Sequence, residues 1–376
     1  MIKKSMKWLS LIVFAFFLGS CGLFNNDTPH DTETDDPTEE VIDDDQDSET
    51  DDDSNDDQAT DEVNQDLSAW MPRLNDVVYS YEGTGTEYAA YTWTPQFNQD
   101  NYYQVATNNG GTVLADVYEY DENEIVQVFS RPETYFRDNF SSIGISENNR
   151  IEEVVLKQPI AVGTSWSSDQ AKYEITAINT EITVPAGTYD TIEVTVTYED
   201  SVTKRYYAED VGLVYEKTEM DDLVVESSLE TIQTDTPETL SITVFTPDDQ
   251  AMGIDTVTAE LTLSTNDPAR KAIAELLRGD NADYPDFYIF PEGTEINYLF
   301  LNDSNVIEAD VSSEYVSNMN AGSSGESLFL HSLTNTLIRY YGAEELLLTV
   351  DGEPYSGGHI LLQEGETLSF NEDIVN

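Results

Sequence analysis

Two periods of hydrophobicity divide this sequence and restrict its fold more than any other feature. Between Trp70 and Thr231 nearly every apolar pattern has period two, and turn residues recur at short intervals. That pattern is typical of antiparallel strands with one buried face. Between Thr239 and Gly352, strand patterns alternate with helical ones. We therefore predict an α+β chain of several domains, in which an antiparallel all-β domain (67–234) precedes a two-layer α/β domain (235–376).

The all-β domain offers a regular series of short strands. A sandwich and a partly closed barrel both fit this pattern. One short helix is expected near 133–139. Tyrosines are frequent, and they either fill the core as cross-strand pairs or line a site for a lipid or a glycan. The expected strands are 88–93, 102–107, 113–120, 125–129, 173–178, 192–198, 205–208, 213–217 and 223–229, and the tyrosines are Tyr102, Tyr103, Tyr118, Tyr120, Tyr206 and Tyr207.

The α/β domain is predicted to run strand, strand, helix, hairpin, helix, strand. The first helix follows a cap in 266–268 and ends at Gly279, where glycine accepts a left-handed conformation. Ser323 and Glu326 have the spacing of a capping box, so they are expected to open the second helix, which Gly342 ends. The expected strands are 240–244, 257–263, 295–301, 306–311 and 345–352.

Five segments of this domain resemble the GerMN domain of bacterial sporulation and germination proteins. They occur in the family's order at 269–279, 290–294, 308–315, 332–337 and 350–352. The resemblance implies a fold like the ring-building motif of envelope-spanning assemblies, and hence a role in protein–protein contacts. It brings no catalytic residues. The acidic stretch 280–288 departs from the family pattern.

The N-terminus looks like an export signal with a lipid attachment site. Three lysines precede the apolar run 8–18, which is too short to span a bilayer. Residues 18–22 then resemble a bacterial lipobox. The resemblance implies a signal peptide (1–20), cleavage between Ser20 and Cys21, and lipidation of Cys21, the only cysteine. An exported protein with an unpaired thiol is the alternative.

Acidic residues dominate the stretch that begins at Cys21. Residues 21–66 are predicted to form a disordered acidic tether, because they hold too little apolar surface to offset their conformational entropy. Calcium binding by the aspartate runs is an alternative, although the spacing of an EF-hand is absent. The whole chain has 16 basic and 75 acidic residues. Nucleic acid is therefore excluded as a partner, because such partners are bound by basic patches.

No catalytic, cofactor or metal site is predicted. His30 falls in the tether, and His331 and His359 lack the spaced histidine or cysteine companions that zinc requires. Ser332 follows His331, but adjacent helical residues point in different directions. The loop before the second helix, 322–325, offers an anion site at a helix N-terminus, although the capping box explains the same residues. We therefore expect a protein that is not an enzyme.

The strands of the α/β domain carry more apolar residues than one buried face requires. Residues 298–301 and 346–348 are consecutively apolar, so both faces of these strands need cover. Cover comes from the same chain or from another molecule.

The function expected is that of a lipid-anchored protein on the outer face of the cell membrane. Its GerMN-like domain would bind partners of an envelope or spore assembly, or a second copy of the chain. An exported module that binds a lipid, peptide or glycan in the β-rich domain is the alternative.

Overall fold

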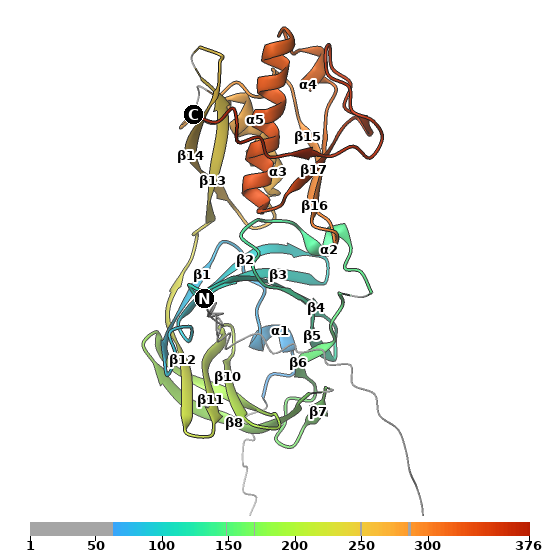
Figure 1. Ribbon diagram of the computed structural model, residues 1–376. Coiled ribbons are helices and arrows are strands. Elements are labelled where there is room, and N and C mark those ends of the chain that lie inside the picture. The colour runs from blue at the N-terminus through green and yellow to red at the C-terminus, as the bar shows by residue number, and fades with distance from the viewer. Residues whose placement is uncertain (1–62, 148, 169, 249, 285–286) are drawn as a thin grey trace, which may run out of the picture. The chain divides into compact units, whose positions relative to one another are not determined.

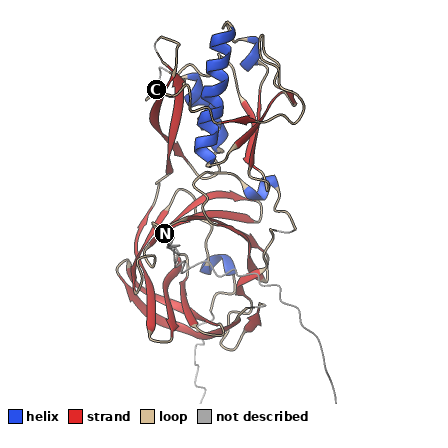
Figure 2. Ribbon diagram, viewed as in Figure 1, coloured by secondary structure: helices blue, strands red, loops and turns tan. Residues whose placement is uncertain are grey.

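A computed structural model describes residues 63–376 except 148, 169, 249 and 285–286. Ser20, Cys21, His30 and nearly all of the predicted tether lie outside the described residues. Residues Val63–Asn376 form one compact unit. Strands make up almost all of its first part, and the long helices belong to its second part (Figure 2). No helix among the described residues is long and apolar enough to cross a membrane.

The first part is one antiparallel sheet of 12 strands. The strands lie in the order β6-β5-β4-β3-β2-β1-β12-β11-β10-β9-β8-β7, so neighbours in sequence pair and β12 returns to β1 (Figure 1). The strands are β1 (Val78–Thr84), β2 (Tyr91–Gln99), β3 (Tyr102–Asn108), β4 (Val113–Tyr120), β5 (Glu124–Arg131), β6 (Glu153–Lys157), β7 (Ser165–Ser167), β8 (Lys172–Val184), β9 (Gly187–Thr197), β10 (Val202–Ala208), β11 (Gly212–Met220) and β12 (Leu223–Gln233).

This sheet nearly closes into a barrel, which decides between the two architectures that the sequence left open. Its end strands β6 and β7 are linked, because the indole N–H of Trp166 donates to the carbonyl oxygen of Val154 at 2.9 Å. The short helix α1 (Leu67–Trp70) lies inside the ring of strands (Figure 1). Its Leu67 and Trp70 are buried with side chains of β5, β6, β8, β9 and β10. The interior is therefore plugged by the chain's own N-terminal segment.

The second part contains two sheets with helices between them. β13 (Glu238–Pro247) and β14 (Ile254–Leu263) form an antiparallel pair, and a five-stranded sheet runs β15-β16-β17-β18, with β19 also paired to β17. Strands β16 and β17 are parallel. The remaining elements are α3 (Ala269–Arg278), β15 (Ile296–Leu301), β16 (Val306–Val311), α4 (Glu314–Ser317), α5 (Ser323–Tyr341), β17 (Glu345–Val350), β18 (Glu353–Pro354) and β19 (Leu368–Ser369).

Both helices begin and end where predicted, but the caps at their starts differ from those expected. Gly279 and Gly342 have positive φ, 74° and 65°, and close α3 and α5 as left-handed caps. Pro268 is the N-cap of α3 and makes no side-chain cap bond. Asn266 instead accepts the backbone N–H of Asn98 at 2.7 Å. Asn266, which lies in the stretch expected to supply the cap, thus holds β2 instead.

The predicted capping box of α5 is wrong. Gly322 is the N-cap, and no side chain caps this helix start. Glu326 is buried and accepts the Tyr355 hydroxyl at 3.2 Å and the backbone N–H groups of His359 and Ile360 at 2.9 and 3.0 Å. Its carboxylate is thus committed to the C-terminal segment, where it binds one hydroxyl and two backbone N–H groups.

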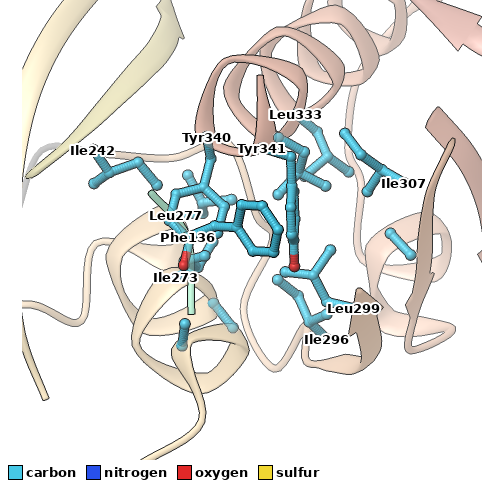
Figure 3. Close-up of a cluster of buried hydrophobic side chains, with 14 of the residues drawn as sticks. Phe136, Ile242, Ile273, Leu277, Ile296, Leu299, Ile307, Leu333, Tyr340 and Tyr341 are labelled. Carbon is cyan, nitrogen blue, oxygen red and sulfur yellow. The ribbon is translucent and has the colours of Figure 1, made fainter. Parts of the chain in front are cut away.

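One hydrophobic core contains side chains from both parts. Phe136, which follows β5, packs beside Tyr341 of α5 with ring centroids 4.7 Å apart (Figure 3). Next to it, the fully buried Arg137 pairs with Glu238 at 2.6 Å. The carboxylate of Asp138 accepts the Tyr341 hydroxyl at 2.7 Å. The predicted helix at 133–139 is therefore wrong, because these residues make long-range contacts, and α2 (Phe140–Ile143) starts after them.

Candidate protein-binding surface

The outer face of the sheet β15–β17 carries apolar side chains that the described chain leaves partly open. The register places Tyr298 opposite Asp310, and Phe300 opposite Glu308, which in turn lies opposite Leu347. Opposed residues share a face, so these five side chains form one patch, here called the outer patch. Tyr298 is 43% exposed, and Phe300 and Leu347 are half-buried. The rings of Tyr298 and Phe300 meet edge to face at 4.6 Å.

The inner face of the same strands is fully used. The alternate residues point toward α3 and α5, and all of them are buried. Consecutive apolar residues therefore fill both faces, as the sequence pattern requires, but the described residues cover only one of the two faces completely. Figure 3 shows Leu299 and Ile307 among the core side chains. The inner residues are Leu299, Leu301, Ile307, Ala309, Leu346 and Leu348.

Carboxylates give the outer patch a negative charge. Glu308 accepts the side-chain amide of Asn302 at 2.7 Å. Asp310 accepts the Thr349 hydroxyl at 2.6 Å and the Gly352 N–H at 2.7 Å, so its position is firmly held. Burial and the charge of Glu308 raise the pKa of Tyr298, which keeps its hydroxyl protonated. The patch thus combines two aromatic rings with two fixed acceptors.

The edge of this sheet is less suited to recognition than its face. β15 pairs only with β16, which leaves its other side as an edge. Arg270 donates to the carbonyl oxygen of Ile296 at 2.7 Å, and the N–H of Leu301 donates to Asp138 at 3.1 Å. Side chains therefore occupy backbone hydrogen-bonding groups at both ends of this edge, which hinders pairing with an added strand.

A second surface feature is a pocket of about 390 Å³ beyond the C-terminal end of α3. Arg278 forms one wall, where it pairs with Asp280 at 2.6 Å and Glu295 at 2.9 Å. Tyr288 lies at its rim and is 66% exposed. Asp280 and Tyr288 belong to the stretch that departs from the family pattern. The sequence did not reveal this pocket, whose lining also includes Phe290, Pro291, Glu292, Gly293, Asn318, Met319, Asn320 and Phe329.

The histidines singled out in the sequence do not come together in one site. His331 is half-buried on α5, burial lowers its pKa, and its Nε2 lies 3.5 Å from the side-chain nitrogen of Asn371. Ser332 is fully buried, and its hydroxyl has no partner among the described residues. The backbone of His359 is held by Glu326. Within the described residues, no group of three or more potential metal ligands is present.

Residues 243–356 match a protein-family model described as Germane, sporulation and spore germination. This part of the chain is therefore a Germane, or GerMN, domain, as the resemblance of its five segments predicted. The strands of the outer patch, the pocket and both long helices lie within the match. Most of the C-terminal segment that Glu326 holds lies beyond it.

Solved structures are similar to parts of this chain. The tandem GerMN domains of the sporulation protein GerM from Bacillus subtilis are 19% identical over 35% of this chain and 46% of that chain, with a TM-score of 0.29. This chain thus spans less than half of that protein. An exported protein of Bacteroides fragilis with a YmcC-like fold is 11% identical over 43% of this chain and 98% of that one, with a TM-score of 0.27. A lipoprotein from Clostridium perfringens is 14% identical over 35% and 87%, with a TM-score of 0.22. No curated protein matches.

Proposed function

We propose that this chain is a lipid-anchored protein on the outer face of the cell membrane, and that its GerMN domain binds a partner protein during spore formation or germination. The observation that carries the proposal is the outer patch, where Tyr298 and Phe300 remain partly open beside fixed carboxylates. Partly exposed aromatic side chains are the groups that most often dominate the energy of protein interfaces. The proposed role is assembly and not catalysis.

The chemistry of the outer patch defines the kind of partner. Glu308 and Asp310 favour lysine or arginine on the facing surface, and the rings of Tyr298 and Phe300 favour apolar side chains between them. The chain's formal charge of −59 would speed the approach of a basic partner. We therefore propose a partner surface with an apolar centre and a basic rim.

Site-specific photocrosslinking in sporulating cells of the source organism tests this proposal. A photoreactive residue replaces Tyr298 in one full-length chain and Leu361 in a matched control, because Leu361 is also exposed but lies in the C-terminal segment. We expect one discrete protein adduct at position 298 and none at position 361. The same adducts at both positions, or none at position 298, would overturn the assignment of the outer patch.

The anchor is tested separately. Cys21→Ala should prevent lipidation, so the protein should appear in the medium or remain as an uncleaved precursor. Fractionation of cells that express the variant, followed by mass spectrometry of the N-terminus, distinguishes these outcomes. A processed Cys21→Ala chain that stays in the membrane fraction would refute lipid anchoring and leave the proposal about the outer patch intact.

A further inference from the structure

The pocket beyond the C-terminal end of α3 has no role in the function proposed above. Its volume of about 390 Å³ lies within the usual range for ligand pockets. Its walls come from the end of α3, from residues 288–293, from residues 318–320 and from Phe329 of α5. All of these segments lie within the GerMN match. The pocket shares no residue with the outer patch, so it is a separate candidate site.

Apolar side chains supply much of the lining. Phe290 is buried, and its ring centroid lies 5.4 Å from that of Tyr315, which is not part of the lining and holds Phe290 from its other side. Phe329 and Met319 also line the pocket and are only half-buried. Tyr288 at the rim is mostly exposed. An apolar group that entered the pocket would therefore remove these open surfaces from water, which favours binding.

The backbone around the pocket is held in place. The N–H of Phe290 donates to the carbonyl oxygen of Leu277 on α3 at 2.9 Å. The side-chain amide of Asn318 donates to the carbonyl oxygen of Glu292 at 2.8 Å and joins two of the walls. The pocket is thus formed by the chain itself, and a ligand would bind without the cost of ordering a loop.

Carboxylates outnumber cations at this site. Arg278 pairs with Asp280 at 2.6 Å and with Glu295 at 2.9 Å, so its positive charge is already balanced. Glu292 lines the pocket, is exposed, and forms no ion pair within the described residues. This excess of negative charge disfavours an anionic ligand and favours a ligand that places positive charge at the rim.

Arg278 also keeps a free donor on the pocket wall. Its Nε donates to Asp280, and one terminal nitrogen donates to Glu295 and to the carbonyl oxygen of Thr294. The second terminal nitrogen has no partner among the described residues. Because the charge is balanced, this nitrogen suits a neutral acceptor such as a peptide carbonyl oxygen. An extended peptide carries such an oxygen beside every side chain, so it satisfies both the apolar lining and Arg278.

We propose that this pocket receives a large apolar side chain, flanked by basic residues, from an extended segment of a partner protein. The apolar side chain lies against Phe290 and Phe329, and the flanking cations face Asp280 and Glu292. A buried apolar anchor with charged neighbours at its rim is the usual anatomy of a strong contact in a protein interface. The proposal does not rest on the outer patch, because it concerns different residues.

Three capped pentapeptides test this proposal on the full-length chain in detergent. The first has a phenylalanine between two lysines, with a glycine at each end. The second replaces the phenylalanine with serine, and the third replaces the lysines with glutamates. Ligand-observed NMR titration measures each Kd. The test variant is Tyr288→Ala, which removes the exposed ring at the rim, and the control is Tyr135→Ala, which removes a tyrosine that is 55% exposed in the first part of the chain.

We expect the peptide with phenylalanine and lysines to bind at least about tenfold more tightly than the other two. Its Kd should rise about fivefold in Tyr288→Ala and stay unchanged in Tyr135→Ala. The serine peptide measures the attraction that the chain's overall negative charge exerts on any basic peptide. Three results would overturn the proposal: equal binding of the phenylalanine and serine peptides, equal binding of the lysine and glutamate peptides, or a Kd that Tyr288→Ala leaves unchanged.

Discussion

The two parts of this molecule use their sheets in opposite ways. The 12-stranded sheet pairs β1 with β12 and brings β6 to β7, so it keeps almost no edge, and it turns Tyr91 and Tyr118 inward. The sheet β15–β17 stays open and turns Tyr298 and Phe300 outward. A closed sheet can enclose a small molecule, whereas an open one can only present a face. The proposed protein partner therefore belongs to the second part, whose sheet presents an open face.

The two parts are nevertheless joined by buried polar residues. Arg137 donates to the carbonyl oxygens of Gln96 and Ser264 at 2.8 and 2.7 Å, in addition to its pair with Glu238. The backbone N–H of Arg137 donates to the Tyr340 hydroxyl at 2.9 Å. One side chain thus binds residues from both parts. The comparison therefore concerns two surfaces of one folding unit, and single substitutions can test how far they are separate.

The largest effect is expected from Arg137→Met. The change removes a buried cation and leaves Glu238 without its partner, which should lower the free energy of unfolding by about 3–5 kcal/mol. Urea unfolding followed by tryptophan fluorescence and circular dichroism measures this loss. Lys217→Met is the control, because its pair with Glu219 lies at the surface, where water screens the attraction, and its loss should leave stability almost unchanged. Equal small losses in both variants would show that Arg137 does not join the two parts.

Neighbouring residues on β15 should respond very differently to truncation. Leu299→Ala opens a cavity in the core and should cost about 2–4 kcal/mol. Tyr298→Ala removes a partly exposed ring and should cost less than about 1 kcal/mol. Thermal and urea unfolding of both variants provide the values. If Tyr298→Ala proved as costly as Leu299→Ala, the ring would be a structural element and the outer patch would lose its main argument.

Glu326→Gln should loosen the C-terminal segment. The carboxylate of Glu326 accepts hydrogen bonds from one hydroxyl and two N–H groups, and a neutral amide is a weaker acceptor. Loss of one hydrogen bond to a charged acceptor costs about 1.5–3 kcal/mol. Limited proteolysis should cut the variant within 355–370 faster than the wild type. Glu364→Gln, an exposed change in the same segment, is the control. Unchanged cleavage would mean that Glu326 is not what holds the segment.

The smallest effect concerns pH. Burial raises the pKa of Asp138 to about 7, whereas an unfolded aspartate is fully ionised above about pH 5. Between about pH 5 and pH 7 the folded state therefore binds a proton that the unfolded state does not. This proton stabilises the folded state, and the stabilisation is lost as the pH rises through 7. Relative to Asp138→Asn, the wild type should gain about 1.4 kcal/mol between pH 8 and pH 6. A difference that stays constant with pH would contradict a buried, titrating Asp138.

Local chemistry explains which features the sequence could predict. The caps at Gly279 and Gly342 and the pairing of 295–301 with 306–311 depend on a few neighbouring residues, and all of them are confirmed. The apolar surplus at 298–301 likewise anticipated the outer patch. The alternation of Glu308 and Asp310 could have shown that the carboxylates share its face, since strand side chains alternate.

Long-range contacts explain what the sequence could not predict. Closure of the 12-stranded sheet depends on β1 meeting β12 about 150 residues later, and no local pattern encodes that pairing. Glu326 had the spacing of a capping residue, but distant N–H groups of the C-terminal segment compete for its carboxylate. Arg137 and Asp138 lie in a stretch that looks helical, and tertiary contacts override that tendency.

The most direct test of the central claim is the affinity of the partner recovered by crosslinking at position 298. Its Kd should be measured for the wild-type chain, Tyr298→Ala and Leu361→Ala under the same salt conditions. We predict that Tyr298→Ala raises the Kd at least about tenfold, as loss of a central aromatic side chain does, while Leu361→Ala leaves it unchanged. Equal affinity of the wild type and Tyr298→Ala would contradict the claim that the open face of β15–β17 exists to bind another protein.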